Sequence, residues 1–407
     1  MTPAHSPVQL AVQTSQDGKA LPLPDPTPPS LTPPVTPTVK DRSTAEQSIA
    51  SPIEAPAEAK VAHPARPTVW SPLRFPDEVE ISRDVQDRPI EFGRGAWSIV
   101  YKAQSKPCAT SSLAPCTPPS SPTAVGRVLA VKAPHRRDAH PVLQAEALTL
   151  TRLNLTTGFE RHVVPFHGYL AESEALVMSA VPLALSTYIE DTADLARKKQ
   201  TTATMFNPIQ GPGAWQDLAR KLISGLEWLH DTAGIVHGDV KPHNILLRPS
   251  ASDIDFEDED IFPYDPLFAD FSSALDLPTD AAPSPNDTTS RTAMSAFTPP
   301  FTAPELLSLA SLTSGDVAPT PASDVFSLAA TLLAAATGDL LLYPGSSNLQ
   351  RLAMAREGQQ IIEFARSGTN GCRVPRKGVV ERIIQPAVCK DPTQRIAPPE
   401  WLVLAST

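Results

Sequence analysis

The chain has 407 residues, which is enough for one large domain or two ordinary ones with tails. Its formal net charge is −10. The acidic excess argues against a nucleic-acid backbone as the main partner, because that attraction needs clustered Lys and Arg. The four cysteines form no CxxC pair and have no nearby His, so they support neither a disulfide framework nor a zinc site and favour an intracellular location, cytoplasmic or nuclear.

Residues 1–76 form a segment dense in Pro, Ser, Thr and Ala, as in LPLPDPTPPSLTPPVTPTVK. This composition lacks the apolar side chains that offset the entropy of ordering, so we expect a disordered, partly polyproline-like extension. Its Ser-Pro and Thr-Pro pairs are candidate targets of proline-directed kinases, and its proline runs are candidate ligands of Pro-binding modules. A passive solvated tail explains the same composition. The first residues also lack the pattern of a signal peptide.

Strand patterns dominate the part of the chain that follows. PIEFGRGAWSIVYKA alternates as strand, glycine turn and strand, and VLAVKA indicates a third strand. Residues 105–126, between them, have loop composition and predict a long insert. Helical spacing runs from Pro141 to Leu153, and ALVMSAV is another strand candidate. We expect a five-stranded lobe at about residues 77–181.

Helical patterns dominate the second half of the chain. AWQDLARKLISGLEWLH places apolar residues on one helical face, while NILL and FADF are short strand candidates around an acidic insert at residues 250–265. The most apolar stretch, Ser327 to Leu342, is too short to span a bilayer comfortably, so we expect a buried helix and no membrane partner. A strand-rich lobe followed by a helical lobe at about residues 182–405 predicts an α+β fold with a cleft between two lobes.

The glycine turn is the first motif that carries chemistry. Gly93, Gly95 and Ser98 fit the pattern GxGxx(G)xV, with Ser98 in place of the third Gly and Val100 at the end. Glycines let backbone amides approach phosphates, and a turn between two strands favours a phosphate-binding hairpin over a Rossmann turn, which needs a following helix. An ordinary hairpin turn fits the motif equally well when it is considered alone.

Two charged residues downstream form a natural pair. Lys132 ends the third strand candidate, and Glu146 lies on the same predicted helical face as Leu150 and Leu153. A Lys at this place would neutralise nucleotide phosphates, and a carboxylate must hold it in position. Each is an ordinary surface charge when taken singly, whereas the ordered pair behind a glycine loop indicates a nucleotide site.

The stretch VHGDVKPHNILL has the layout of a phosphoryl-transfer loop. Asp239 would accept or orient the proton of an attacking hydroxyl, and Lys241 would balance charge on the transferred phosphoryl group. Asn244 and Asp270, the latter in ADFSSA, are the expected ligands of Mg²⁺, because this ion prefers one or two carboxylates together with phosphate oxygens. The metal cofactor expected from these residues is Mg²⁺.

Taken in order, these motifs make the chain from about Pro89 to Trp401 resemble the eukaryotic protein kinase superfamily, Ser/Thr type. The resemblance implies a two-lobed kinase fold in which Met178 is the gatekeeper and Ser179 to Val181 form the hinge that contacts the nucleotide. It also implies ATP as the nucleotide cofactor beside Mg²⁺. The resemblance further implies that TPPFTAPE ends an activation segment. The further positions matched to the family are Thr298 in that segment, Glu305 of APE, Arg395 as the buried partner of Glu305, and Asp324 as the structural Asp of the F helix.

Two departures from the family pattern leave alternatives open. Gly238 stands where most protein kinases have the Arg that helps bind an activation-loop phosphate, so we expect activity that does not depend on loop phosphorylation. Ser272 turns the usual DFG into DFS. A pseudokinase that uses its fold only for binding is one alternative. A small-molecule phosphotransferase of the aminoglycoside or choline kinase type, whose loops also contain His-Gly-Asp, is the other.

Overall fold

The computed structural model describes residues 69–106, 127–199, 201–250, 260–277, 299–308 and 317–407. All of these residues belong to one compact unit that spans Pro64–Thr407. Some expectations lie outside the described residues, namely those for residues 1–68, for 107–126 of the loop insert, for 251–259 of the acidic insert and for Thr298.

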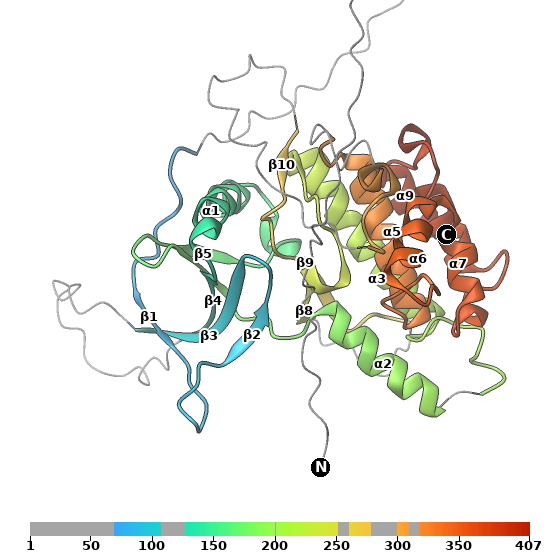
Figure 1. Cartoon of the computed structure of the whole chain (residues 1–407), viewed down its shortest axis with the longest axis horizontal. Helices are drawn as coiled ribbons and strands as arrows, with labels where there is room; N and C mark the ends of the chain where they lie inside the picture. Colours follow the sequence, from blue (N-terminus) through green and yellow to red (C-terminus); the bar gives the residue numbers. More distant parts are fainter. Residues whose placement is uncertain (1–68, 107–126, 200, 251–259, 278–298, 309–316) are drawn as a thin grey trace, which may run out of the picture. The chain divides into compact units, whose positions relative to one another are not determined.

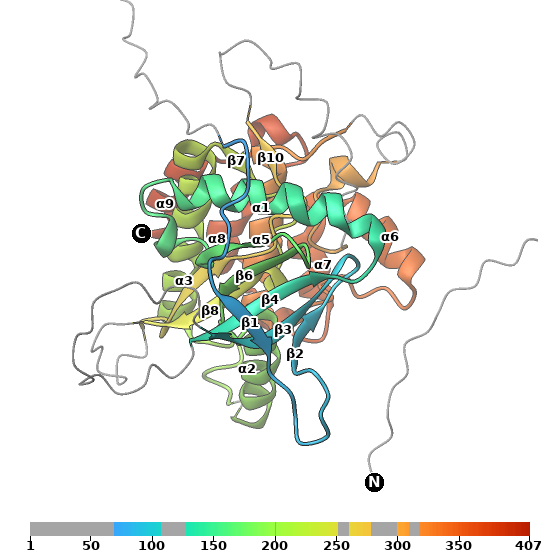
Figure 2. The same cartoon turned by 90° about the vertical axis from the view of Figure 1, so that its left-hand side faces the viewer.

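An antiparallel sheet of six strands forms the N-terminal lobe, in the order β1-β3-β4-β6-β5 with β2 also paired to β3 (Figure 1). Its strands are β1 (Glu78–Ile81), β2 (Glu91–Arg94), β3 (Ser98–Lys106), β4 (Val128–Pro134), β5 (Phe166–Leu170) and β6 (Ala175–Ser179). The central strands β4 and β6 are nearly continuous runs of buried residues, because both of their faces are covered. The helix α1 (His140–Asn154) lies across one face of the sheet (Figure 2).

An interruption of the first strand explains why the sheet has six strands where five were expected. Both β1 and β2 pair with β3. Lys102 on β3 accepts a hydrogen bond from Ser82 N at 2.8 Å and donates one to Ile90 O at 2.9 Å, so β1 and β2 meet at a single position of β3. The residues between them leave the sheet as a short excursion. The Asp84 carboxylate closes it by accepting hydrogen bonds from two backbone amides.

The residues just before β1 belong to the folded domain. Leu73 N donates a hydrogen bond to Thr151 Oγ1 of α1 at 2.9 Å, and Tyr169 N of β5 donates one to Leu73 O at 2.7 Å. Phe75 packs against a small apolar cluster formed by β3, β4 and β6. The sequence placed the start of the domain at residue 77, whereas these contacts extend it to Leu73. One aromatic anchor and a few backbone hydrogen bonds suffice to order a segment whose average composition is that of a loop.

The C-terminal lobe is mainly helical and also contains two short sheets, β7 with β10 and β8 with β9. Its helices are α2 (Leu185–Lys199), α3 (Pro212–Glu227), α5 (Pro321–Thr337), α6 (Asn348–Arg356), α7 (Ile361–Ser367), α8 (Val379–Ile384) and α9 (Pro398–Ala405). Its strands are β7 (Ile235–Val236), β8 (Ile245–Pro249), β9 (Tyr264–Phe268) and β10 (Leu275–Asp276). The strand expected over FADF therefore ends at Phe268, before the acidic residue that matters for chemistry.

The expected buried helix is α5. Thr320 and Ser323 form a reciprocal capping box at its start, and every residue from Ser323 to Thr337 is buried. The helix ends at Thr337, short of the expected Leu342, because Gly338 takes a left-handed conformation with φ of +72°. Among the residues that the structure describes, no helix has both the length and the apolar character needed to cross a bilayer.

Candidate active site

Lys132 of β4 lies between two carboxylates from distant parts of the chain. Its Nζ atom donates hydrogen bonds to both carboxylate oxygens of Glu146 on α1, at 2.8 and 2.6 Å, and to Oδ1 of Asp270 at 2.8 Å. Lys132 is 4% exposed and Glu146 2% exposed. The face of α1 that carries Glu146 also carries Leu143 and Leu150, whose burial against the sheet turns the carboxylate toward β4. The ion pair expected from the sequence is therefore present.

This cluster fixes the charges of Lys132 and Asp270. Burial alone would lower the pKa of Lys132, but the neighbouring carboxylates of Asp270 and Glu146 raise it above its ordinary value. Burial would likewise raise the pKa of Asp270, yet the Lys132 ammonium outweighs burial and holds that pKa well below its usual range. Lys132 thus remains a cation and Asp270 an anion at neutral pH.

A second group of polar residues follows β7. Lys241 Nζ lies 2.6 Å from Oδ2 of Asp239, and Asn244 Nδ2 donates to the same oxygen at 3.0 Å and to the Asp239 carbonyl at 2.9 Å. Burial raises the pKa of the Asp239 carboxyl, although the Lys241 charge opposes this shift. A raised carboxyl pKa brings the group closer to the value suited to proton transfer near neutral pH.

Backbone contacts join the two groups. Ala269 N, directly before Asp270, donates to Asn244 O at 2.9 Å, and His237 Nε2 lies 3.1 Å from Ala269 O. Phe271 N donates to Glu146 Oε1 at 3.1 Å, and the Phe271 ring lies 4.8 Å from the His237 ring between centroids. The structure therefore brings the segments of Lys132, Glu146, Asp239, Lys241, Asn244 and Asp270 together.

Hydrogen bonds to Asp324 of α5 fix the loop that carries Asp239. The buried Asp324 carboxylate accepts hydrogen bonds from His237 N at 2.7 Å and from Gly238 N at 3.0 Å, and it lies 3.1 Å from His230 Nε2. Gly238 has φ of +80°, and a Cβ atom there would lie 2.4 Å from the Ser273 carbonyl oxygen. Glycine fits this turn because it tolerates the left-handed conformation and presents no side chain to the neighbouring backbone.

The donor set suits a magnesium ion. The side-chain nitrogen of Asn244 is used by Asp239, while its side-chain oxygen accepts no hydrogen bond from the described residues. One oxygen of Asp270 binds Lys132 and Ser272 N, and Oδ2 accepts no hydrogen bond from the described part of the chain. One carboxylate oxygen and one amide oxygen, with phosphate oxygens, match the ligands that Mg²⁺ takes in nucleotide sites. No cluster of three or more His, Cys, Asp or Glu suited to a metal occurs among the described residues.

The glycine hairpin lies between β2 and β3, where Gly93 pairs with Val100 and Gly95 N donates to Ser98 O at 2.8 Å. Neither glycine has a positive φ, and a Cβ at Gly93 would meet nothing within 4 Å. These glycines therefore provide open space, which suits a phosphate, rather than an unusual backbone. Trp97 at the tip contacts Arg136, whose guanidinium carbon lies 5.0 Å from the ring centroid.

The expected gatekeeper, Met178, and the expected hinge residues after it lie on and after β6. Met178 is 9% exposed and pairs with Ala130 of β4, while Ser179 Oγ lies 2.9 Å from His167 Nε2. Val181 packs against the main core. Their contact with a nucleotide stays a prediction.

One contact has no signal in the sequence. Arg152, six residues after Glu146 on α1, forms a bidentate ion pair with Asp276 of β10, with one hydrogen bond of 2.7 Å. In turn β10 pairs with β7, the strand that leads into the Asp239 loop. Arg152 thus links the helix that carries Glu146 to the segment that follows Asp270.

The expected anchor of the activation segment is also present. Arg395 binds Glu305 through two parallel hydrogen bonds of 2.7 Å, and its side chain is only 1% exposed. The Arg395 guanidinium also donates to Ala322 O at 2.8 Å at the start of α5. This bidentate pair fixes the end of that segment to the helical lobe.

Comparison with known proteins agrees with this geometry. A protein kinase domain model matches residues 124–403, more than half of the 407 residues, and the chain therefore belongs to the protein kinase family. It is 30% identical over 217 residues to the serine/threonine-protein kinase ISR1 of Eremothecium gossypii, which covers 51% of this chain and 52% of that protein. It is 37% identical over 131 residues to the serine/threonine-protein kinase PknK of Mycobacterium tuberculosis, covering 31% of this chain and 9% of that protein. The chain thus spans about half the length or less of these curated relatives.

Proposed function

We propose that this chain is a protein serine/threonine kinase that transfers the γ-phosphoryl group of ATP to a hydroxyl group of a protein. The observation that carries the proposal is the convergence of Lys132, Glu146 and Asp270 in one ion cluster beside the group of Asp239 and Asn244. Membership of the protein kinase family and the two serine/threonine kinases among the relatives support it.

Each polar residue has a role in this reaction. Asp239 orients the attacking hydroxyl and accepts its proton, while Lys241 balances charge on the transferred group. Lys132, held by Glu146, pairs with nucleotide phosphates, and Gly93 and Gly95 leave room for them. Asn244 and Asp270 would hold Mg²⁺, which when bound neutralises phosphate charge.

Replacement of Asp239 by Asn tests the assignment. The variant keeps the size of the side chain but loses the proton acceptor, so phosphoryl transfer should fall by about 100-fold or more while ATP binding persists. Wild type and variant are assayed with a peptide library beside a panel of small alcohols, and ATP–Mg²⁺ binding is followed by thermal shift. Equal transfer by both proteins would refute the role of Asp239. No thermal shift at millimolar ATP would favour the pseudokinase, and transfer to the alcohols alone would favour a small-molecule phosphotransferase.

We also propose that activity is independent of phosphorylation in the activation segment. Gly238 offers no side-chain donor to a phosphate, and the direct Arg152–Asp276 ion pair already links α1 to β10. Treatment of the purified protein with a phosphatase should therefore leave the rate within about twofold. Loss of most activity, with loss of phosphate from the activation segment shown by mass spectrometry, would contradict the proposal.

We further propose an intracellular location, cytoplasmic or nuclear, because the four cysteines form no CxxC pair and indicate no disulfide framework. The Ser-Pro and Thr-Pro pairs of residues 1–76 are proposed targets of proline-directed kinases, and the proline runs are proposed ligands of Pro-binding modules. Mass spectrometry of the chain isolated from its cells would test the first of these tail proposals.

A further inference from the structure

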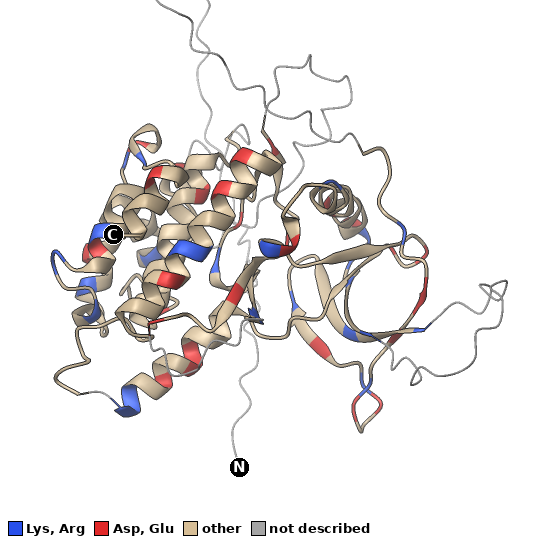
Figure 3. Cartoon of the chain, turned by 180° about the vertical axis from the view of Figure 1, so that it is seen from behind, with Lys and Arg blue, Asp and Glu red and all other residues tan. Residues whose placement is uncertain are grey.

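A pocket of about 560 Å³ lies mainly on the helical lobe, where that lobe meets the turn before β5, and includes none of the residues assigned to phosphoryl transfer. Its floor is one face of α3, since Asp217, Arg220, Lys221 and Ser224 recur at helical spacing. Its walls come from the turn before β5, from the β8–β9 pair and from α9. On the face shown in Figure 3, basic and acidic positions occur close together along α3.

Three arginines from three separate elements line this pocket. Arg161 belongs to the turn after α1, Arg220 to α3 and Arg248 to β8. With Lys221 they face two carboxylates, Asp217 and Asp265, so the lining carries more positive than negative charge. Burial and the neighbouring Arg161 both lower the pKa of His162, which also lines the pocket and is therefore neutral at pH 7.

The carboxylates orient two of the arginines and leave the third available. Arg220 lies 2.6 Å from Asp217, and Arg248 lies 3.6 Å from Asp265, its partner across the β8–β9 pair. The guanidinium group of Arg161 makes no hydrogen bond or ion pair with the residues that the structure describes. A cation that borders a pocket without a partner is available to an anionic ligand.

The chemistry of the lining selects the class of ligand. Guanidinium groups bind phosphate oxygens in bidentate fashion, and clusters of arginine are a recurring way to recognise phosphorylated peptides. The pocket is far larger than a phosphate group alone, and Pro266 and Leu402 add apolar surface beside the charges. We propose that this pocket, which we call the arginine pocket, binds a phosphorylated serine or threonine within a peptide segment of another protein.

Direct binding tests the proposal without any need for catalysis, so its outcome does not depend on the proposed kinase activity. Fluorescence polarisation of a labelled degenerate peptide library with a fixed phosphothreonine is compared with the same library carrying threonine. We expect the phosphorylated library to bind at least about tenfold more tightly, and Arg161→Ala to weaken that binding by about tenfold. Arg161→Ala breaks no hydrogen bond or ion pair among the described residues, so we expect the fold to be kept, and urea denaturation of the variant checks this.

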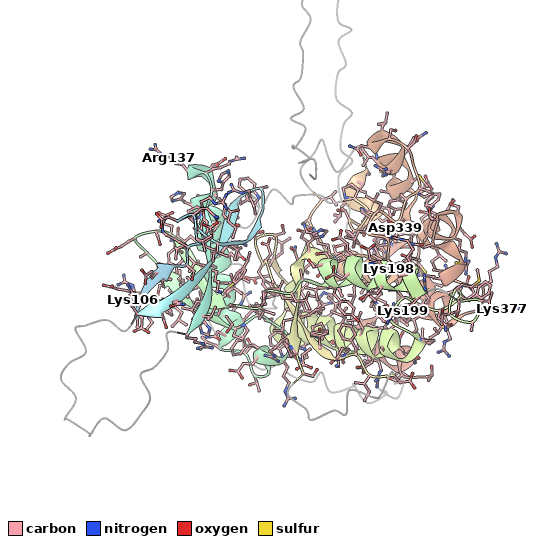
Figure 4. All side chains as sticks on the ribbon, turned by 90° about the horizontal axis from the view of Figure 1, so that it is seen from below. Lys106, Arg137, Lys198, Lys199, Asp339 and Lys377 are labelled. Carbon is pink, nitrogen blue, oxygen red and sulfur yellow. The ribbon has the colours of Figure 1, made fainter. Side chains whose placement is uncertain are left out.

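Two further measurements complete the test. Arg376→Ala removes an exposed arginine of the same lobe, beside the Lys377 labelled in Figure 4, and should leave binding unchanged. Inorganic phosphate should compete only at concentrations far above those of the phosphopeptide, and equal competition would overturn the peptide part of the proposal. Equal binding of the two libraries, or unchanged binding by Arg161→Ala, would overturn the arginine pocket as a phosphate site. Phosphopeptide held in the active site would survive the Arg161 change and would count against the proposal.

Discussion

At the scale of single residues, the environment of Asp239 sets when it can accept a proton. Burial raises its pKa, and the Lys241 ammonium 2.6 Å away opposes that rise. The rate of phosphoryl transfer should fall as the pH falls through the pKa of Asp239, because the protonated acid cannot take the hydroxyl proton.

Removal of Lys241 should shift the acid limb of the pH–rate profile, that is, the pH range over which the rate falls as Asp239 becomes protonated. Lys241→Ala takes away a charge that lowers the pKa of Asp239, so the pKa rises and the rate is lost at a higher pH than in the wild type. The measurement is the pH profile of kcat/KM for both proteins, and only the position of the limb is compared. Lys241→Arg keeps the charge and should keep the limb in place. A limb that moves to lower pH in the Ala variant would contradict the assignment.

Gly238 is a second residue that can be tested singly, because a side chain there would meet the backbone of Ser273 at close range. Gly238→Ala forces a Cβ to within 2.4 Å of Ser273 O, at φ of +80°. Gly158→Ala is the matched control, because Gly158 has φ of +87° but its Cβ would meet only the Trp228 side chain among the described residues, with Nε1 nearest at 3.4 Å. The control should cost about 1 kcal/mol in unfolding free energy, and Gly238→Ala about 1–3 kcal/mol more. Urea denaturation measures both, and equal losses would mean that the close contact relaxes freely.

Much of the candidate site could be predicted from residues alone, because its parts carry local signals. The sequence shows a Lys in a strand candidate, a Glu on the apolar face of a helix, and Asp239 five residues before Asn244. Lys132 was expected to end its strand, whereas β4 continues to Pro134. The Arg152–Asp276 pair could not be predicted, since the two residues are separated by 124 positions and each is an ordinary charge in its own segment. Only the fold brings them together.

At the scale of elements, this ion pair predicts a measurable coupling between α1 and β10. Arg152→Ala should reduce kcat several-fold, because α1 can then shift and move Glu146 away from Lys132. The charge-exchanged double variant, Arg152→Asp with Asp276→Arg, should recover part of the loss, equivalent to a coupling of about 1 kcal/mol. Steady-state kinetics of the wild type, Arg152→Ala, the single variants Arg152→Asp and Asp276→Arg, and the double variant measures this coupling.

The controls separate positioning from general stability. Arg376→Ala disrupts an exposed pair with Glu363 and should leave kcat unchanged. Similar losses in the single variants, with no recovery in the exchanged protein, would show that Arg152 and Asp276 act independently of each other.

The strands show which boundaries could be predicted from the alternation of apolar and polar residues and which could not. The glycine hairpin and the third strand were visible because alternation persists on both sides of the turn. The break between β1 and β2 was not visible in the sequence. The residues between these strands form a turn in which the Asp84 carboxylate, and not a neighbouring strand, accepts two backbone hydrogen bonds. The strand expected over FADF ends early because Asp270 takes φ of +63°, which no strand accommodates.

At the scale of the whole molecule, the segment before β1 shows how a domain acquires its boundary. The backbone of Leu73 forms hydrogen bonds with α1 and with β5, and Phe75 packs against an apolar cluster separate from the main core. The segment therefore joins the sheet to the helix that carries Glu146. Its contribution should be measurable as stability of the full-length chain.

Phe75→Ala should destabilise the full-length chain by about 1–2 kcal/mol, since a half-buried aromatic ring contributes less than the 3–5 kcal/mol of a fully buried one. Trp70→Ala is the matched control five residues earlier, because Trp70 is 82% exposed and its loss should change stability by less than about 0.5 kcal/mol. Urea denaturation followed by circular dichroism compares the two variants with the wild type. Equal effects would mean that Phe75 contributes no more than an exposed ring, and that the folded domain begins at β1 as its sequence composition indicates.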